Sequence, residues 1–319
     1  MTDAATVLPR VSVVVATFRP VPDLLRAALR SALAQTLTNF EIILSVDGDA
    51  SDAEHLVAEL GDRRLRLVHN TTPPGAWSNH RFALRSAQGP YVAILNHDDL
   101  WEPSFLQSLV PVLEGDPDLV VAFCDHWIID ERGNRLVEET DHNSRRWGRA
   151  ALRRGALTDL VTLCVQQSVP MAVGAVFRRS ALDESIVADE AGPAYDLWLT
   201  YALARTRGRA HYEPTRLTSW RIHPQGHTTA GSSDWALGSA LCWEQIASDP
   251  RFEAYRQEAQ SRAAEAFCLA AIHTLRRRHR SAARTHAQRS LHHRPGPRAA
   301  AAWLATWLPG AVLSRTLNA

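Results

Sequence analysis

The first hundred residues alternate between short apolar runs and segments whose apolar residues recur at helical spacing. The apolar runs predict strands over residues 11–16, 40–46, 64–69 and 91–95. The segments between them predict helices over residues 23–35, 52–60 and 75–88. Strands that alternate with helices of this length form a mostly parallel, doubly wound sheet. This part of the chain therefore predicts an α/β fold.

The pattern changes after residue 118 and again after residue 230. Residues 118–230 mix predicted strands and a helix with a hairpin turn at 130–134, which is typical of an α+β arrangement. Residues 231–319 are rich in Ala, Arg, Gln and His and keep a helical periodicity to about residue 291. We therefore expect one domain over residues 1–230, divided into 10–117 and the remainder, and a helical C-terminal extension.

Composition limits the partners and the compartment. The 319 residues include 35 basic side chains, all Arg, against 34 acidic ones, so bulk charge does not indicate a nucleic-acid partner. The four cysteines are widely spaced, which is typical of buried thiols in a reducing compartment. The N-terminus lacks the features of a signal peptide, and the apolar stretch 299–313 falls short of the ~20 residues that span a bilayer. We expect a cytoplasmic protein.

Polar side chains follow the fourth predicted strand at the point where it ends, in the sequence Asn96-His97-Asp98-Asp99. Doubly wound sheets bind ligands at the carboxyl ends of their strands. Adjacent carboxylates repel each other unless a cation or hydrogen bonds stabilise them. Two interpretations follow: a divalent-metal site, or a solvated turn in which Asp99 caps a helix that begins near Pro103.

Four polar motifs occur in a fixed order along the chain. They are Ala16-Thr17-Phe18-Arg19, Asp47-Gly48-Asp49, Asn96-His97-Asp98-Asp99, and Tyr195-Asp196-Leu197-Trp198 with Arg221-Ile222-His223 after it. Their order and spacing over residues 10–228 resemble family 2 glycosyltransferases of the GT-A fold. The resemblance implies a GT-A doubly wound mixed sheet, with a Rossmann-like nucleotide-sugar-binding half at 10–117 and an acceptor half at 118–230. It also implies an inverting transfer from a nucleotide-diphosphate sugar with the help of a divalent metal.

The resemblance implies a site for Mg²⁺ or Mn²⁺ at the diphosphate of the donor. Asp98 occupies the ligating position of the family's DxD motif, and His223 is the second implied ligand. Asn96 replaces the first acid of that motif, and His97 lies between the two as a spacer or a donor contact. Arg221 is expected to pair with the diphosphate. Because Asn96 carries no charge, we expect a lower metal affinity than the family's usual acid would provide.

The same resemblance places the nucleotide at the ends of the first two strands. Asp47 matches the acid that accepts a hydrogen bond from the nucleobase, and Thr17 and Arg19 match the loop that lines the nucleotide pocket. Asn79 and Arg81 fall where the third helix approaches the donor sugar. The alternatives are an ordinary turn for Asp47, an ordinary loop for Arg19 and a surface ion pair for Arg81.

A later helix begins with the implied general base. The family supplies this base from an acidic pair before an apolar helix face; here the pair is Tyr195-Asp196, so Asp196 is the implied catalytic residue. An inverting transfer needs such a base to remove the proton of the acceptor hydroxyl. The alternative is that Asp196 only caps the helix. Further on, the segment that contains His227, Thr228 and Thr229 is expected to close over the donor.

The combined prediction is a hexosyltransferase-type glycosyltransferase of surface-polysaccharide or secondary-metabolite biosynthesis. The expected donor is a UDP- or dTDP-sugar, and the acceptor is a glycan, a lipid-linked molecule or a small molecule. Loss of two family acids, at Asn96 and Tyr195, leaves open a catalytically impaired sugar-nucleotide-binding protein, and a nucleotidyltransferase is a further alternative. The arginine-rich run 276–280 and the amphipathic segment around Trp303 and Trp307 leave open a peripheral membrane contact.

Overall fold

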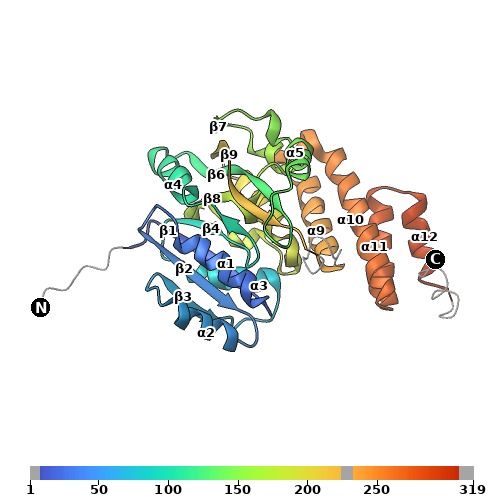
Figure 1. The fold of residues 1–319 in the computed structure, drawn as a ribbon. Coiled ribbons are helices and arrows are strands. Elements are labelled where there is room, and N and C mark those ends of the chain that lie inside the picture. Colours follow the sequence, from blue (N-terminus) through green and yellow to red (C-terminus); the bar gives the residue numbers. More distant parts are fainter. Residues whose placement is uncertain (1–7, 224–232, 309–319) are drawn as a thin grey trace, which may run out of the picture. The chain divides into compact units, whose positions relative to one another are not determined.

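The computed structural model describes residues 8–223 and 233–308, which divide into two compact units (Figure 1). The first unit consists of residues 8–186 and 202–223. The second consists of residues 187–201 together with the described residues after 232.

Two predictions fall on residues 224–232, which lie outside the described part of the chain. They are the closing segment with His227, Thr228 and Thr229, and the domain boundary after residue 230. Both stay predictions. Within the described residues, no helix combines the length and the apolar character needed to cross a membrane.

One mixed sheet runs through the first unit. Its strands in the described residues are β1 Val11–Thr17, β2 Phe40–Val46, β3 Leu65–His69, β4 Tyr91–Ile94, β5 Leu100–Trp101, β6 Leu119–Ile129, β7 Gly155–Leu157, β8 Ala175–Arg178 and β9 Arg209–Arg221. Their order is β3-β2-β1-β4-β8-β6-β9-β5, and β7 pairs with β9 (Figure 1). The strands expected from the apolar runs are present, whereas β5, β7 and the full length of β6 and β9 were not expected.

Strand direction brings the carboxyl ends of six described strands to one edge of the sheet. β1 pairs in parallel with β2 and with β4, and β8 pairs antiparallel with both β4 and β6. Because two reversals restore the direction, β6 runs the same way as β4, and β9 is parallel to β6. β3 is parallel to β2 as well. The carboxyl ends of β1, β2, β3, β4, β6 and β9 therefore face the same edge, which is where sheets of this kind bind ligands.

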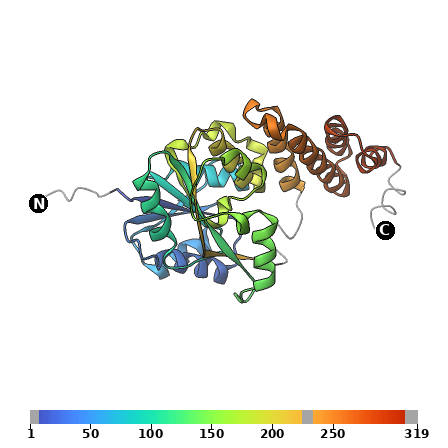
Figure 2. The ribbon, with the colours of Figure 1, turned by 90° about the horizontal axis from the view of Figure 1, so that it is seen from above.

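Helices lie on both sides of this sheet (Figure 2). The described helices of the first unit are α1 Pro22–Leu33, α2 Ser51–Leu60, α3 Ala76–Arg85, α4 Phe105–Gly115, α5 Val137–Arg146, α6 Leu160–Val165 and α7 Met171–Gly174, with short 3₁₀ turns η1 Arg149–Ala151, η2 Arg179–Ala181 and η3 Glu184–Ile186. All seven residues of β1 are buried. Val13 and Val15 share a core with Leu25 and Leu29 of α1, and each such side chain stabilises the fold by roughly 1.5–3 kcal/mol.

The hairpin expected at 130–134 is reduced to a turn and one bridge. The Asp130 Oδ1 accepts hydrogen bonds from the backbone N–H groups of Arg132 at 2.9 Å and Asn134 at 2.8 Å, and a single antiparallel bridge joins Ile129 to Arg135. The chain then forms α5 and no second strand. Acidic residues in the first turn of α5 and arginines in its last turn complement the helix dipole, which favours the helix at this point.

The second unit is helical in its described residues. It contains η4 Asp189–Ala194, most of α8 Tyr195–Ala204, α9 Ser233–Ser248, η5 Pro250–Tyr255, α10 Arg256–Arg276, α11 Arg280–His293 and α12 Pro297–Ala305. A Cβ at Gly238 of α9 would lie 2.1 Å from the carbonyl oxygen of Ala191, so only glycine lets the backbones of α9 and η4 approach this closely. The Trp198 indole also donates to the Gly238 carbonyl at 2.9 Å. These contacts fix η4, and with it the start of α8.

Two breaks divide the long helical periodicity that the sequence shows after residue 231. At the first, Pro250 begins a 3₁₀ turn, and the Asp249 carboxylate accepts a hydrogen bond from the backbone N–H of Arg251 at 2.9 Å. At the second, Arg278 adopts a left-handed conformation with φ of 66°. Pro250 is a helix-breaking residue that the sequence itself shows, whereas at Arg278 only the backbone shows that the helix ends.

Candidate active site

The carboxyl ends of β1 and β2 are tied together by Asn79 of α3. Its side chain is buried, and its Nδ2 donates to the backbone oxygens of Thr17 at 3.0 Å and Ser45 at 3.2 Å. Its Oδ1 accepts a hydrogen bond from the Ser45 hydroxyl at 2.6 Å. Most of the hydrogen-bonding capacity of this amide is therefore used inside the protein. Asn79 positions the strand ends, and its contact with a donor sugar stays a prediction.

Asp47 follows β2 and is held against the start of α3. It is buried, and its backbone N–H donates to the Thr17 carbonyl at 2.9 Å. Its Oδ2 accepts from the Gly75 N–H at 2.8 Å, and its Oδ1 accepts a long hydrogen bond from Asn70 at 3.4 Å. A carboxylate can accept about four hydrogen bonds, so this oriented group keeps capacity for a ligand N–H.

Thr17, whose backbone carbonyl accepts the Asp47 N–H, carries a buried hydroxyl. Within the described residues, its Oγ1 is buried and has no hydrogen-bond partner. A buried hydroxyl without a partner costs about 1–3 kcal/mol, so this atom is better explained if a ligand bonds to it. The two predicted arginines lie over aromatic rings: Arg19 is 5.1 Å from the centre of the Phe18 ring, and Arg81 is 5.9 Å from that of Trp77.

The structure brings the two predicted metal ligands together. Asp98 follows β4 and His223 follows β9, two strands that the sequence separates by more than a hundred residues. The His223 Nε2 lies 3.0 Å from the Asp98 Oδ2, and both side chains are largely buried. The pair lies at the edge of the sheet where the carboxyl ends of the parallel strands lie.

This pair fits a divalent cation that also binds substrate oxygens. Within the described residues, no group of three or more His, Cys, Asp or Glu side chains is arranged to hold a metal. Mg²⁺ is commonly bound by one or two carboxylates together with phosphate oxygens, and not by a cage made only of protein ligands. Imidazole and carboxylate together also suit Mn²⁺. The chemistry of Asp98 and His223 therefore fits such a cation, and their role as metal ligands stays a prediction.

Asp99 has a different role from its neighbour. It is only 1% exposed, and its Oδ1 accepts a hydrogen bond from the backbone N–H of Arg221 at 2.8 Å, while its Oδ2 accepts one from the Asn96 amide at 2.9 Å. Burial, and then the adjacent Asp98 carboxylate, raise the pKa of Asp99 well above its ordinary value. Asp99 therefore joins the end of β4 to the end of β9.

The Arg221 side chain stabilises this edge of the sheet by hydrogen bonds to backbone carbonyl oxygens. Its Nε donates to the Asp98 carbonyl at 2.8 Å, and one terminal nitrogen donates to the carbonyls of Asp130 and Glu131, each at 3.0 Å. The residue is 6% exposed. In the structure this guanidinium is bound to protein carbonyls, so its pairing with a diphosphate stays a prediction.

His97 and Asp196 complete the set of predicted residues. His97 lies near His80 of α3, whose pKa is lowered to about 4 by burial, and His97 adds to this shift. Asp196 lies in the second unit, at the start of α8, and burial raises its pKa. Its Oδ1 accepts a hydrogen bond from the N–H of Leu197 at 2.8 Å. An N-cap bonds the amide two or three residues on, so this contact does not make Asp196 a conventional cap.

Sequence analysis missed a second group of charged side chains, on the strands β6 and β9. Asp125 lies within the buried run of β6 and is paired with Arg149 and Arg216. The available signal was a carboxylate inside an otherwise apolar strand, because such a group needs partners when it is buried.

The mixed sheet with helices on both sides is a GT-A type of fold, and its strand edge carries Asp47, Thr17 and the Asp98–His223 pair. The family model described as glycosyl transferase family 2 matches residues 12–185, more than half of the chain. The chain therefore belongs to glycosyl transferase family 2. The resemblance stated from the motifs is confirmed.

Solved structures confirm the GT-A type of mixed sheet with a C-terminal helical region. A fragment of Staphylococcus aureus TarS has a TM-score of 0.61 at 15% identity, over 93% of this chain and 90% of that one. The mannosyltransferase PcManGT of Pyrobaculum calidifontis, solved with GDP-Man and Mn²⁺, has a TM-score of 0.55 at 19% identity, over 95% and 88%. At these identities the likeness shows the fold alone.

Curated relatives match a shorter part of the chain. An uncharacterized glycosyltransferase of Methanocaldococcus jannaschii is 32% identical over 41% of this chain and 46% of its own. The Escherichia coli enzyme WfaP, named as a UDP-Glc:alpha-D-GlcNAc-diphosphoundecaprenol beta-1,3-glucosyltransferase, is 31% identical over 33% of this chain and 41% of its own. The match thus spans less than half the length of these relatives.

Replacement of Arg221 by Met tests its role at the sheet edge. The variant keeps the apolar stem and removes the charged donors of three carbonyls, so we expect the free energy of unfolding to fall by about 3 kcal/mol. Arg132→Met, at an exposed position of the neighbouring turn, is the matched control and should change it by less than about 0.5 kcal/mol. Denaturant titration measures both, and equal stability of the two variants would contradict the supporting role.

Proposed function

We propose that this protein is an inverting glycosyltransferase that moves a sugar from a nucleotide-diphosphate donor to an acceptor hydroxyl. Family membership supports the reaction class. The observation that carries the finer proposal is the Asp98–His223 pair at 3.0 Å, at the same sheet edge as Asp47 and the hydroxyl of Thr17. A divalent cation held by this pair would neutralise the charge that develops on the departing diphosphate.

The nucleotide is assigned to the ends of β1 and β2. The Asp47 carboxylate would accept the N–H of the base, because it is oriented by Gly75 and keeps free lone pairs. The hydroxyl of Thr17 would find its hydrogen bond with the same ligand. A uracil or thymine base offers the N–H that this arrangement requires. TarS has been solved with UDP-GlcNAc, and the name of WfaP states UDP-Glc, which supports a UDP- or dTDP-sugar donor.

Asp196 is the proposed general base. A group that removes a proton works best when its pKa lies near the working pH, and burial raises the pKa of Asp196 in that direction. Tyr195 replaces the acid that precedes this residue in the family, so no carboxylate at position 195 repels the ionised base.

The proposed acceptor is a surface glycan or a lipid-linked glycan. The WfaP name states an acceptor linked to diphosphoundecaprenol, which is a lipid. The C-terminal segment of the chain would suit work near a membrane. No acidic residue follows Glu265, whereas nine arginines do.

The structure adds an apolar element to this basic segment. Leu304 is 58% exposed and Trp307 is 59% exposed. The guanidinium of Arg284 lies 3.4 Å from the centre of the Trp307 ring. Exposed apolar side chains flanked by arginines are typical of helices that lie on an anionic membrane surface. We therefore infer a peripheral contact with anionic lipid through the end of α10, the turn after it, α11 and α12.

Replacement of Asp98 by Ala tests the metal site. We expect transfer to fall by about 10³-fold, since metal charge stabilisation is worth several kcal/mol, and we expect the fold to persist. Metal-dependent thermal stabilisation by UDP-sugars should be lost as well. Asp52→Ala, at an exposed position of α2, is the control and should behave like the wild type. Donor stabilisation without turnover in the wild type would support a sugar-nucleotide-binding protein in place of an enzyme.

Replacement of Asp196 by Asn tests the base. The variant should bind donor normally and lose about 10³-fold in kcat, with exposed Glu190→Gln as the control. The base acts when ionised, and burial keeps it protonated to a higher pH than an ordinary carboxyl group. The acid limb of kcat/KM should therefore lie above the ordinary pKa of 3.8. An unchanged acid limb in the variant would remove this assignment.

Vesicle binding tests the membrane contact. The full chain should sediment with vesicles that contain phosphatidylglycerol and not with pure phosphatidylcholine, and salt should release it. Replacing Arg276 and Arg278 by Gln should weaken binding about 30-fold, at about 1 kcal/mol for each arginine. The same change at Arg63 and Arg132, both exposed in the first unit, is the control. Equal losses from the two pairs would argue against a contact through the C-terminal helices.

A further inference from the structure

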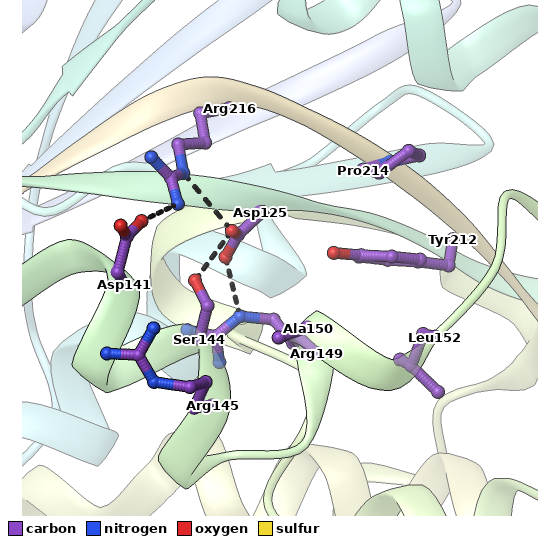
Figure 3. Close-up of a pocket in the computed structure, with 10 residues that line it drawn as sticks. All are labelled: Asp125, Asp141, Ser144, Arg145, Arg149, Ala150, Leu152, Tyr212, Pro214 and Arg216. Atoms are coloured by element: carbon purple, nitrogen blue, oxygen red, sulfur yellow. Dashed lines mark hydrogen bonds and ion pairs between the residues drawn. The ribbon is translucent and has the colours of Figure 1, made fainter.

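A pocket of about 190 Å³ lies on one face of β6 and β9, within the first unit (Figure 3). It is bounded by α5 and η1. Its charged and hydroxyl-bearing lining residues are Asp125, Asp141, Ser144, Arg145, Arg149, Tyr212 and Arg216. None of them belongs to the strand-edge site described above.

The acidic groups of this pocket already have partners. The Asp125 carboxylate is buried and accepts hydrogen bonds from Ser144 at 2.6 Å, from Arg149 at 2.8 Å and from Arg216 at 3.3 Å (Figure 3). Burial opposes its ionisation, but the hydrogen bonds from Ser144 and Arg149 prevail and lower its pKa below the ordinary value. Arg216 also donates to Asp141 at 2.5 Å. Both carboxylates are therefore paired with arginine.

The groups without a partner are hydrogen-bond donors. The Tyr212 hydroxyl points across the pocket toward Asp125 (Figure 3), and within the described residues it makes no hydrogen bond, although the residue is only 2% exposed. Burial raises the pKa of this phenol, so the hydroxyl keeps its proton. Arg145 also lines the pocket, and the described part of the chain provides it with no ion pair. Because the Tyr212 hydroxyl faces the pocket, a ligand bound there can accept its hydrogen bond.

The charges of the side chains that line the pocket favour one kind of ligand. Three arginines face two aspartates, so the pocket has an excess of one positive charge, at Arg145. A ligand that only accepts hydrogen bonds and carries negative charge would satisfy both this guanidinium and the Tyr212 hydroxyl. The volume is below the range of about 300–1,000 Å³ that is common for drug-sized ligands, so it suits a small group.

A second hollow adjoins the pocket and gives room for the rest of such a molecule. It measures about 550 Å³ and shares Asp125 and Arg216 with the first. Trp127 lines it, with the guanidinium groups of Arg135 and Arg216 at 4.5 and 4.6 Å from the ring centre.

We propose that the pocket over β6 and β9 binds the phosphate group of a phosphate-bearing molecule, through the Tyr212 hydroxyl and the Arg145 guanidinium. The site is distinct from the strand edge, because Asp125 lies within β6, four residues before its end at Ile129. The proposal does not depend on the transferase activity.

Calorimetric titration of the full chain with inorganic phosphate tests it, in EDTA so that no metal links phosphate to Asp98. We expect saturable binding that acetate at the same ionic strength does not reproduce. Tyr212→Phe keeps the ring against Phe123, whose centre lies 5.1 Å away, and removes only the hydroxyl. This variant and Arg145→Gln should each bind phosphate at least tenfold more weakly.

Arg146→Gln is the matched control, because Arg146 is the next residue of α5, lies over Trp147 and is not part of the pocket lining. It should bind phosphate like the wild type. Phosphate held at the strand edge would still bind to the Tyr212 and Arg145 variants, so equal affinity in all four proteins would overturn the proposal. Absence of saturable binding to the wild type, or equal binding of acetate, would also overturn it.

Discussion

The buried carboxylate of Asp99 joins the end of β4 to the end of β9, and the candidate metal site depends on this contact. One oxygen accepts a hydrogen bond from the backbone N–H of Arg221, which is two residues before His223. The other accepts one from the side-chain amide of Asn96. This connection also explains the departure from the family's DxD motif. An ionised acid at position 96 would have no N–H to donate to Asp99 and would add charge beside two carboxylates. The asparagine therefore suits the acid that holds the two strands together.

The regular part of the fold was predictable because buried strands and amphipathic helices leave different periods in the sequence. The family motifs predicted that Asp98 and His223 belong to one site. They did not predict how the fold brings the two side chains together. It requires β8 to enter the sheet antiparallel between β4 and β6, and nothing in the local pattern of β8 specifies that neighbour. Arg221 shows a second limit. An arginine that binds backbone carbonyls and one that binds phosphate use the same planar group of donors, so residue type alone could not separate these roles.

Asp125 shows how irregular strand pairing creates chemistry away from a sheet edge. The register between β6 and β9 shifts on both sides of Asp125, and this residue is paired with Arg216 as a result. Such bulges redirect side chains and are common where strands carry functional groups. A bulge depends on two strands that lie far apart in sequence, and so the apolar pattern of β6 alone could not reveal the charged pocket on its face.

The absence of acidic residues after Glu265 changes the meaning of the chain's small net charge. The nine arginines beyond that point face no acid in the same segment, while the preceding residues carry 26 arginines and 34 acids. The net charge of +1 is therefore the sum of two larger charges of opposite sign. The molecule has an uneven distribution of charge along its sequence, and exposed charges are screened beyond about 10 Å at 0.1 M salt. Near a charged surface, added salt therefore weakens the attraction of one part of the chain and weakens the repulsion of the other.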